Sequence, residues 1–299
     1  TGVHLLPFRN PVELAHRVAY LDHLAQGRLL FGIGAGGLPT DVQIFDVDFD
    51  SGQHREMMRE AIDVILHIWR NEGPSEYKGK YWQVKVPDPK EYEFATLKKF
   101  RVPFQQPHPP IGVAASSPGS DTLKLAGENG WIPMSLGLGP AYLAGHWDAV
   151  LEGASRGGRD APSRSEWRIV RDVWIADTDE EAVRSAREGM MFRAWTEYLF
   201  PLFAFGPIPL TTGMKHDDNV PDEAVDLEYL LKHLWLVGSP DTVAQKIRDL
   251  YEVSGGFGTL LAMVLDHSED RQSSEKSMRL LMDEVLPRVS DLTGNGSKP

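Results

Sequence analysis

Helical stretches and short apolar runs alternate along most of this chain, and that order restricts the folds it can adopt. Residues 11–26 have helical periodicity, and Gly27 supplies a stop. One face of this predicted helix carries four apolar residues, Leu14, Val18, Leu21 and Leu24. Residues 28–34 follow at once as a short apolar run, which is typical of a buried parallel strand. Repeated helix and strand units predict an α/β fold with a parallel sheet.

The same order continues to the end of the chain. A second helical stripe is formed by Met58, Ala61, Ile62, Ile65 and Trp69. A further helix is expected over 140–154, and another after the capping-box pair Thr178 and Glu181. Ser239-Pro240-Asp241 places a cap residue before a first-turn proline and so predicts one more helix start.

The apolar runs that suit strands lie at 1–6, 28–34, 111–115, 131–136, 167–176 and 257–265. These six runs are two fewer than a closed (β/α)8 TIM barrel needs. At about 30 residues per βα unit, we expect the first two units, on the order of 80 residues, to precede Thr1. The expected architecture is therefore a single barrel domain over residues 1–299 that is incomplete at its N-terminus.

Two stretches interrupt the alternation and are interpreted as excursions on the barrel rim. Residues 72–110 hold many prolines and aromatics, and Tyr81 to Val86 alternate like a hairpin strand. Residues 199–226 are rich in Pro, Gly and Phe. A loop of that length is usually functional or disordered, and its apolar side chains favour a lid.

The composition excludes several classes of function. A formal net charge of -12 would repel nucleic acids and anionic membranes, so neither is expected as a partner. The chain has no cysteine, which excludes disulfides, thiolate catalysis and Cys-ligated metals. Redox chemistry would need a cofactor. No apolar stretch is long enough to span a bilayer and no signal segment opens the chain, so we expect a cytoplasmic protein.

A serine-rich turn at 116–120 is the most informative candidate site. It joins the apolar run 111–115 to a helix, at the strand end where barrel active sites form, and helix N-termini there favour a phosphate. The hydroxyls of Ser116, Ser117 and Ser120 could add donors. Ordinary helix capping by serine and proline explains the same residues, while the position on the rim favours function.

The glycine cluster from Gly32 to Gly37 offers a second candidate. It matches a dinucleotide fingerprint poorly, because Leu38 to Asp41 continue a loop instead of opening a helix. Close backbone approach is the better interpretation, since residues without a Cβ let a flat ligand lie on the strand end. A tight structural turn is the alternative.

His4 and His267 follow the first and last strand runs, so each is a possible polar contact to a ligand. Lone histidines are more often structural. No HExxH, GxSxG or P-loop pattern occurs, and His108 has no metal-ligand partner at useful spacing, so no metal site is predicted.

Two blocks of the sequence resemble the bacterial luciferase-like family of flavin-dependent monooxygenases. The first combines Leu5-Leu6-Pro7 and Leu21-Asp22 with the run from Phe31 to Gly36. The second combines Leu236 to Val243 with Gly255 to Leu260, and the two blocks occur in the family's order. The run Asp226-Leu227-Glu228-Tyr229-Leu230 is most similar to the terpenoid-oxidising branch, which includes limonene and diketocamphane monooxygenases.

The resemblance implies a two-component monooxygenase. It would take reduced FMN from a separate NAD(P)H flavin reductase and oxidise a small, apolar, terpenoid-like ketone or alkene with oxygen through a C4a-peroxyflavin. The protein would supply orientation and a dry pocket, and a homodimer is expected. FAD or coenzyme F420 are alternative cofactors. Alternative functions are a deazaflavin-dependent oxidoreductase on the same barrel and a non-catalytic flavin-binding protein.

The resemblance also assigns residues. Cofactor-binding positions are Gly2, Val3, Gly34, Ala35, Ser116, Ser117, Gly119, Ser120 and Met134. Gly2-Val3 matches a strand end that commonly holds a non-proline cis peptide under the flavin. The family's phosphate-gripping arginine aligns with Ala35, so the serine turn or other cations must replace it. The family's catalytic histidine belongs to the segment before Thr1, which leaves His4 and His267 as the catalytic candidates within the chain.

Overall fold

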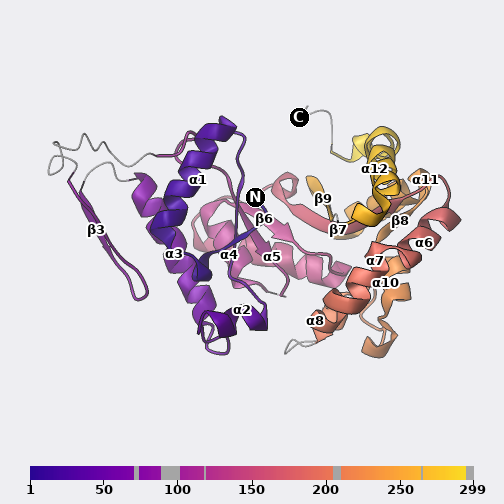
Figure 1. Ribbon diagram of the computed structural model, residues 1–299, viewed down its shortest axis with the longest axis horizontal. Helices are drawn as coiled ribbons and strands as arrows, with labels where there is room; N and C mark the ends of the chain where they lie inside the picture. The colour runs from indigo at the N-terminus through magenta and orange to yellow at the C-terminus, as the bar shows by residue number, and fades with distance from the viewer. Residues whose placement is uncertain (71–73, 89–101, 118, 205–209, 264, 294–299) are drawn as a thin grey trace. The chain divides into compact units, whose positions relative to one another are not determined.

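The computed structural model describes the chain except for residues 71–73, 89–101, 118, 205–209, 264 and 294–299. It forms two compact units, Thr1–Ala114 and Ala115–Pro299, whose elements are labelled in Figure 1. Each unit is an α/β structure built on parallel strands, as the alternation predicts.

The first unit contains the strands β1 (His4–Leu5), β2 (Phe31–Gly34) and β5, which spans Ile111–Ala115. They are parallel in that order, with His4 opposite Ile33 and Phe31 opposite Ile111. The helices are α1 (Pro11–Ala25), α2 (Pro39–Ile44) and α3 (Gln53–Arg70).

Helix α1 forms as predicted but buries a different face. Leu14 and Val18 are buried, whereas Leu21 and Leu24 are 36% and 61% exposed, so their assignment to the core is wrong. Asp22 is buried in their place. Its two carboxylate oxygens accept hydrogen bonds of 2.8 Å from the backbone and side-chain nitrogens of Gln105. A buried carboxyl group with such hydrogen-bond partners can lie on a helix face that apolar periodicity alone would assign to apolar residues.

Helix α3 buries all five residues of its predicted stripe, and the indole of Trp69 donates to the carbonyl of Ala15 over 3.1 Å. A hairpin follows, made of antiparallel strands β3 (Ser75–Lys78) and β4 (Gln83–Val86). The alternation from Tyr81 to Val86 therefore does mark a hairpin strand. Part of the 72–110 excursion, residues 89–101, lies outside the described residues.

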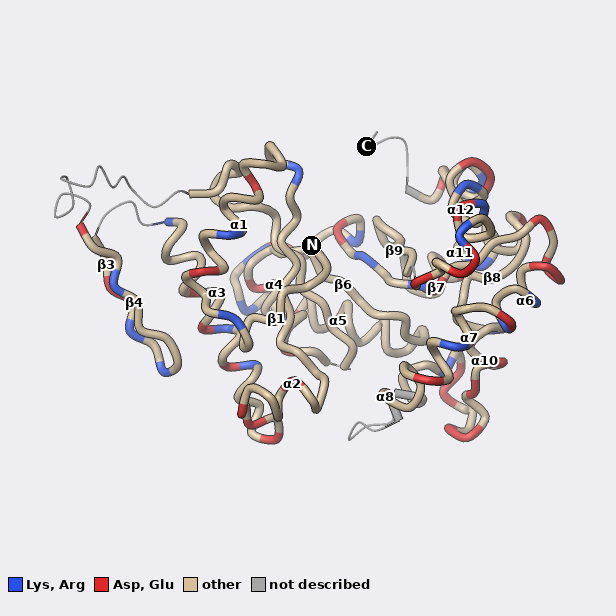
Figure 2. Tube along the Cα trace, in the orientation of Figure 1, with Lys and Arg blue, Asp and Glu red and all other residues tan. Residues whose placement is uncertain are grey.

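The second unit contains the strands β6 (Ile132–Ser135), β7 (Arg168–Ile175), β8 (Leu236–Gly238) and β9 (Thr259–Met263). β6, β8 and β9 each pair with β7 in parallel. β6 and β9 pair with it from its first residue onward, and β8 pairs with its last three residues. Figure 2 draws β6, β8 and β9 without charged residues.

The count of six strand runs is wrong. The described residues form seven parallel strands, because β8 was missed. It is only three residues long and follows α10 closely, so its apolar residues continue the apolar sequence of that helix. The described residues do not close an eight-stranded barrel.

The longer helices of the second unit are α4 (Asp121–Asn129), α5 (Pro140–Arg156), α6 (Asp179–Glu188), α11 (Pro240–Ser254) and α12 (Arg271–Leu280). Shorter ones are α7 (Met190–Ala194), α10 (Leu227–His233) and α13 (Leu286–Val289). The predicted caps are confirmed: the hydroxyls of Thr178 and Ser239 accept from the backbone of Glu181 and Thr242. None of the helices described has the length and apolar character to cross a membrane.

The predicted loop at 199–226 is partly helical, which corrects that expectation. It contains α8 (Phe200–Ala204) and α9 (Leu210–Gly213). Phe203 packs against Trp195, with ring centroids 5.7 Å apart. Pro201 led to the prediction of a loop here, although proline is tolerated in the first turn of a helix such as α8. Phe205 and Ile208, also assigned to a lid, lie outside the described residues.

Candidate functional site

The serine turn lies between β5 and α4, as predicted, but its hydroxyls have different roles. Ser120 is buried, caps α4 by accepting from the backbone of Leu123, and lies 2.7 Å from the hydroxyl of Thr122. Helix capping, the alternative interpretation, therefore describes this residue. The hydroxyls of Ser116 and Ser117 have no hydrogen-bond partner among the described residues, and Ser117 is exposed.

Gly119 completes the open side of the turn. Its φ of +59° is a backbone conformation that side chains disfavour, and a Cβ there would meet nothing within 4 Å. The space beside Gly119 is thus open, and two nearby hydroxyl donors have no hydrogen-bond partner within the described part of the chain. The turn can accept an anion without first breaking internal hydrogen bonds.

The turn is supported by the close crossing of α4 and α5. A Cβ on Gly127 would lie 2.1 Å from the carbonyl oxygen of Val150, and one on Gly153 would lie 1.9 Å from that of Lys124. Only glycine permits this approach, which holds the middle and last turn of α4 against α5.

A buried hydrogen-bonded chain runs beneath the turn. His146 on α5 lies between the Ser117 carbonyl oxygen, 2.9 Å from Nε2, and the Ser135 hydroxyl, 2.9 Å from Nδ1. The indole of Trp167 donates to that same hydroxyl over 2.9 Å. His146, Ser135 and Trp167 have no exposed surface. The chain links β6 and the residue before β7 to the backbone of the turn.

The donors among these buried groups can be assigned by elimination. Trp167 can only donate and the Ser117 carbonyl can only accept, so the Ser135 hydroxyl accepts from the indole and Nε2 of His146 carries a proton and donates to Ser117. Burial lowers the pKa of His146 to about 4, so the ring is neutral and Nδ1 accepts from the Ser135 hydroxyl. Sequence reasoning missed His146, although it falls on the buried stripe of α5 between Leu143 and Val150.

Charged groups near the turn do not favour an anion by themselves. Asp121 occupies the first turn of α4, and the ammonium of Lys124 pairs with Glu152 at 2.9 Å. An anion bound here would be held by neutral donors and backbone N–H groups.

The candidates of the first unit lie around β1 and β2. A Cβ on Gly32 would lie 2.5 Å from the carbonyl oxygen of Thr1, and one on Gly34 would lie 3.1 Å from Val3. Gly32 and Gly34 therefore accommodate the neighbouring residues Thr1 and Val3, a structural role that differs from the tight turn expected as the alternative to a ligand. Ala35 is partly buried beside them. The Gly2–Val3 peptide is trans, so that expectation is wrong; exposed Gly2 lacks the close packing that would enforce a cis bond.

His4 packs against Phe31, with ring centroids 5.6 Å apart. Its Nε2 atom is buried and has no hydrogen-bond partner among the described residues. Burial, followed by the charge of Arg9, lowers the pKa of His4, so the ring is neutral near pH 7. The imidazole is thus held as a packed ring.

Met134 and His267 belong to the second unit. Met134 is partly buried on β6, opposite Arg168 of β7 and next to Ser135 of the buried chain. His267 lies beyond β9, packed on Trp174 with ring centroids 4.7 Å apart, and burial lowers its pKa.

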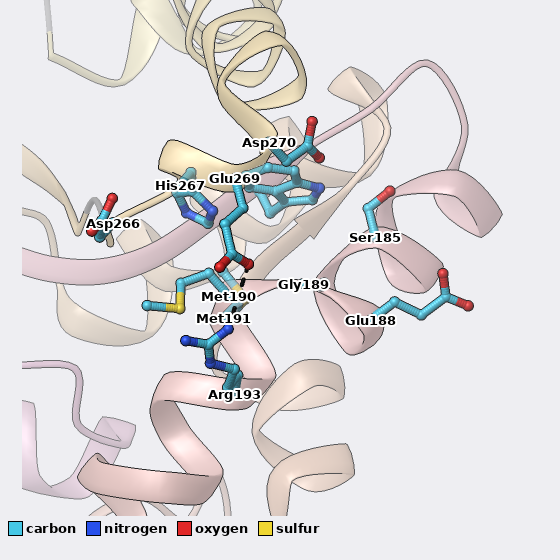
Figure 3. Close-up of a pocket in the computed structure, with 12 residues that line it drawn as sticks. Ser185, Glu188, Gly189, Met190, Met191, Arg193, Asp266, His267, Glu269 and Asp270 are labelled. Carbon is cyan, nitrogen blue, oxygen red and sulfur yellow. Dashed lines mark hydrogen bonds and ion pairs between the residues drawn. The ribbon is translucent and has the colours of Figure 1, made fainter.

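His267 lines a cavity of about 280 Å³ between the α6–α7 junction and the segment 266–270. Figure 3 shows Arg193 and Glu269 joined across it, at 3.4 Å. Asp266, Asp270 and Glu188 also line the cavity, and the methionines Met190 and Met191 supply apolar surface. This excess of carboxylates disfavours an anionic ligand, so the cavity is a poor phosphate site.

Adjacent buried charges on β7 form another feature that sequence reasoning missed. The guanidinium of Arg171 donates to the carbonyl of Leu138 over 2.8 Å, and the indole of Trp195 donates to Asp172 over 3.0 Å. Burial raises the pKa of Asp172 to about 6 and lowers that of Arg171 to about 10. Asp172 is thus a carboxyl that can exchange a proton near neutral pH.

Comparison with known proteins gives a consistent result. The family model described as "Luciferase-like monooxygenase" matches residues 1–256. The 3,6-diketocamphane 1,6-monooxygenase of Pseudomonas putida is 33% identical, over 96% of this chain and 78% of that protein. Limonene 1,2-monooxygenase of Rhodococcus erythropolis is 29% identical, over 97% of this chain and 68% of that protein.

A solved structure extends the likeness to three dimensions. It is the oxygenating constituent of 3,6-diketocamphane monooxygenase from Pseudomonas putida, a type II Baeyer-Villiger monooxygenase in complex with FMN. It superposes with a TM-score of 0.85 at 34% identity, over 96% of this chain and 78% of that one.

Proposed function

This chain belongs to the luciferase-like monooxygenase family, and from that premise we infer that it is the FMN-dependent oxygenase of a two-component system. The observation that carries the inference is the serine turn at the end of β5, where the hydroxyls of Ser116 and Ser117 have no hydrogen-bond partner among the described residues and His146 supports the backbone from below. The diketocamphane and limonene relatives give the reaction class: insertion of one oxygen atom into a compact ketone or alkene.

The turn fits the phosphate of FMN. It combines two hydroxyls without a partner in the described part of the chain, a glycine with open space beside it, and the N-terminus of a nine-residue helix. Ser116, Ser117 and the backbone at Gly119 would hold the phosphate, while Ser120 would act through the helix cap. Gly2, Val3, Gly34, Ala35 and Met134 remain proposed contacts to the rest of the flavin.

When bound, reduced FMN supplies two electrons and activates oxygen, so that one atom enters the substrate and the other leaves as water. The protein must exclude water and orient the substrate. His4 and His267 remain the candidates for a polar contact to the substrate oxygen. Both rings are neutral near pH 7 and can donate one hydrogen bond without bringing a charge.

The substrate we propose is small, apolar and terpenoid-like. Residues 198–214 carry no charge. Within this stretch Phe200 and Phe203 pack on the cluster around Trp195. A charged substrate beneath such a lid would be desolvated without a counter-ion. A separate reductase is proposed because a relative of the chain is named as the oxygenase component of a flavin-dependent monooxygenase.

The test is flavin binding by Ser116→Ala and Ser117→Ala variants under anaerobic conditions. Each lost hydroxyl should weaken reduced FMN binding at least about tenfold, since a hydrogen bond to a charged group is worth about 1.5–3 kcal/mol. Ser163→Ala, a change at an exposed serine in a remote 3-10 turn, is the control. Unchanged FMN affinity in the double variant would place the phosphate elsewhere.

A further inference from the structure

We propose that His146 is a positioning residue for the flavin phosphate: it holds the backbone of Ser117 so that the turn presents its hydroxyls and not its carbonyl oxygen. This rests on the proposed function above. The residue does not touch the open side of the turn, because it is fully buried beneath it.

The geometry specifies what His146 does. Its Nε2 atom lies 2.9 Å from the carbonyl oxygen of Ser117, whose exposed side chain has no hydrogen-bond partner among the described residues. A carbonyl oxygen facing a phosphate would repel it. By binding that oxygen from inside the protein, the imidazole directs the carbonyl inward, so the opposite side of the residue faces the ligand.

The imidazole ring of His146 cannot rotate away from the Ser117 carbonyl. Nδ1 accepts from Ser135, whose hydroxyl is fixed by the indole of Trp167. Both partners of the ring are therefore determined, and the bond to Ser117 is the only one left to Nε2. A chain of three buried polar groups is costly to leave unsatisfied, so its members hold one another in a single arrangement.

The imidazole is neutral, since burial lowers the pKa of His146 to about 4. It therefore adds no charge that would attract a phosphate over a distance. Its contribution is geometric, so it should affect ligands that use the turn and leave the others unaffected. FMN and riboflavin provide that comparison, because they share the isoalloxazine ring and differ in the phosphate.

The experiment measures the affinity of the full chain for FMN and for riboflavin, by anaerobic titration of the reduced flavins. Four proteins are compared: wild type, His146→Leu, His146→Gln and Ser135→Ala. Leucine fills much of the space but removes both hydrogen bonds. Glutamine retains an N–H donor that can reach Ser117. Ser135→Ala removes the group that orients the ring and serves as the independent test if His146→Leu does not fold.

The preference for FMN over riboflavin should fall about tenfold in His146→Leu, because the misplaced turn loses one well-placed hydrogen bond to the charged phosphate. It should fall less in Ser135→Ala and return toward the wild-type ratio in His146→Gln. His54→Leu is the matched control, since His54 is also a buried histidine with a lowered pKa but lies on α3. Its preference for FMN should not change.

Two results would overturn the proposal while leaving the phosphate site intact. One is an unchanged preference in His146→Leu and Ser135→Ala. The other is equal weakening of both flavins, which would indicate a structural role alone. If wild type itself binds riboflavin as tightly as FMN, the turn is not a phosphate site, and the proposed function fails together with this inference.

Discussion

The imidazole of His146 and the indole of Trp167 bind the same hydroxyl, that of Ser135, each over 2.9 Å. The shared hydroxyl holds the ring in place, and the carbonyl of Ser117, which can only accept, puts the proton on Nε2. These buried hydrogen bonds explain how a turn with few neighbouring cations can present its donors in one arrangement.

The buried histidine predicts a specific pH dependence of stability. Its pKa is about 4 in the folded protein and about 6.5 in an unfolded chain. Between these values the unfolded chain binds a proton that the folded protein does not, so stability falls as the pH falls through this window. At pH 5 this term removes about 2 kcal/mol from wild type relative to pH 7.5.

His146→Gln has no such proton to bind. Its free energy of unfolding, measured with urea at several pH values, should decrease less on acidification than that of wild type, by about 2 kcal/mol at pH 5. If the free energies of unfolding of the two proteins decrease equally with falling pH, the pKa of His146 is not lowered in the folded protein.

The crossing of α4 and α5 predicts a contrast between two glycines. Gly127→Ala places a methyl group 2.1 Å from the Val150 carbonyl and should destabilise the protein by about 3 kcal/mol. Gly145→Ala lies on α5 with nothing within 4 Å and should stabilise it by about 0.5 kcal/mol through helix propensity. Thermal unfolding of both variants tests this, and similar melting temperatures would refute the close crossing.

Helix α1 supplies a test of which face is buried. Leu14 is 2% exposed, and Leu14→Ala should cost about 2–5 kcal/mol. Leu24 is 61% exposed, and Leu24→Ala should change stability by no more than about 0.5 kcal/mol. Chemical denaturation distinguishes the two. A large loss of stability in Leu24→Ala would mean that the buried face of α1 is the one that apolar periodicity predicts.

Much of the architecture could be predicted from local sequence signals. Met58, Ile62 and Ile65 repeat at helical spacing because they face a core, and Ser239-Pro240 marks a helix start for reasons contained in those two residues. β8 could not be found this way, since a three-residue strand is defined by its partner β7. The buried face of α1 was misjudged because it depends on Gln105, far away in the sequence.

The candidate site, too, could be predicted only in part from the sequence. The serine turn was located from its position after an apolar run. The roles within it depend on burial, which gives Ser120 to the helix cap and leaves Ser117 exposed. His146 and Asp172 went unrecognised because each lies within an apolar stretch of sequence, where only the folded structure shows which polar groups they meet.

The central claim is that this chain transfers one oxygen atom from molecular oxygen to a small apolar substrate. The most direct measurement supplies reduced FMN, isotopically labelled oxygen and a panel of bicyclic ketones, limonene and long-chain aldehydes, and analyses the products by mass spectrometry. We predict a lactone or epoxide from a terpenoid member that carries one labelled atom. Consumption of oxygen to hydrogen peroxide with every substrate, or labelled product from the aldehydes alone, would contradict the account.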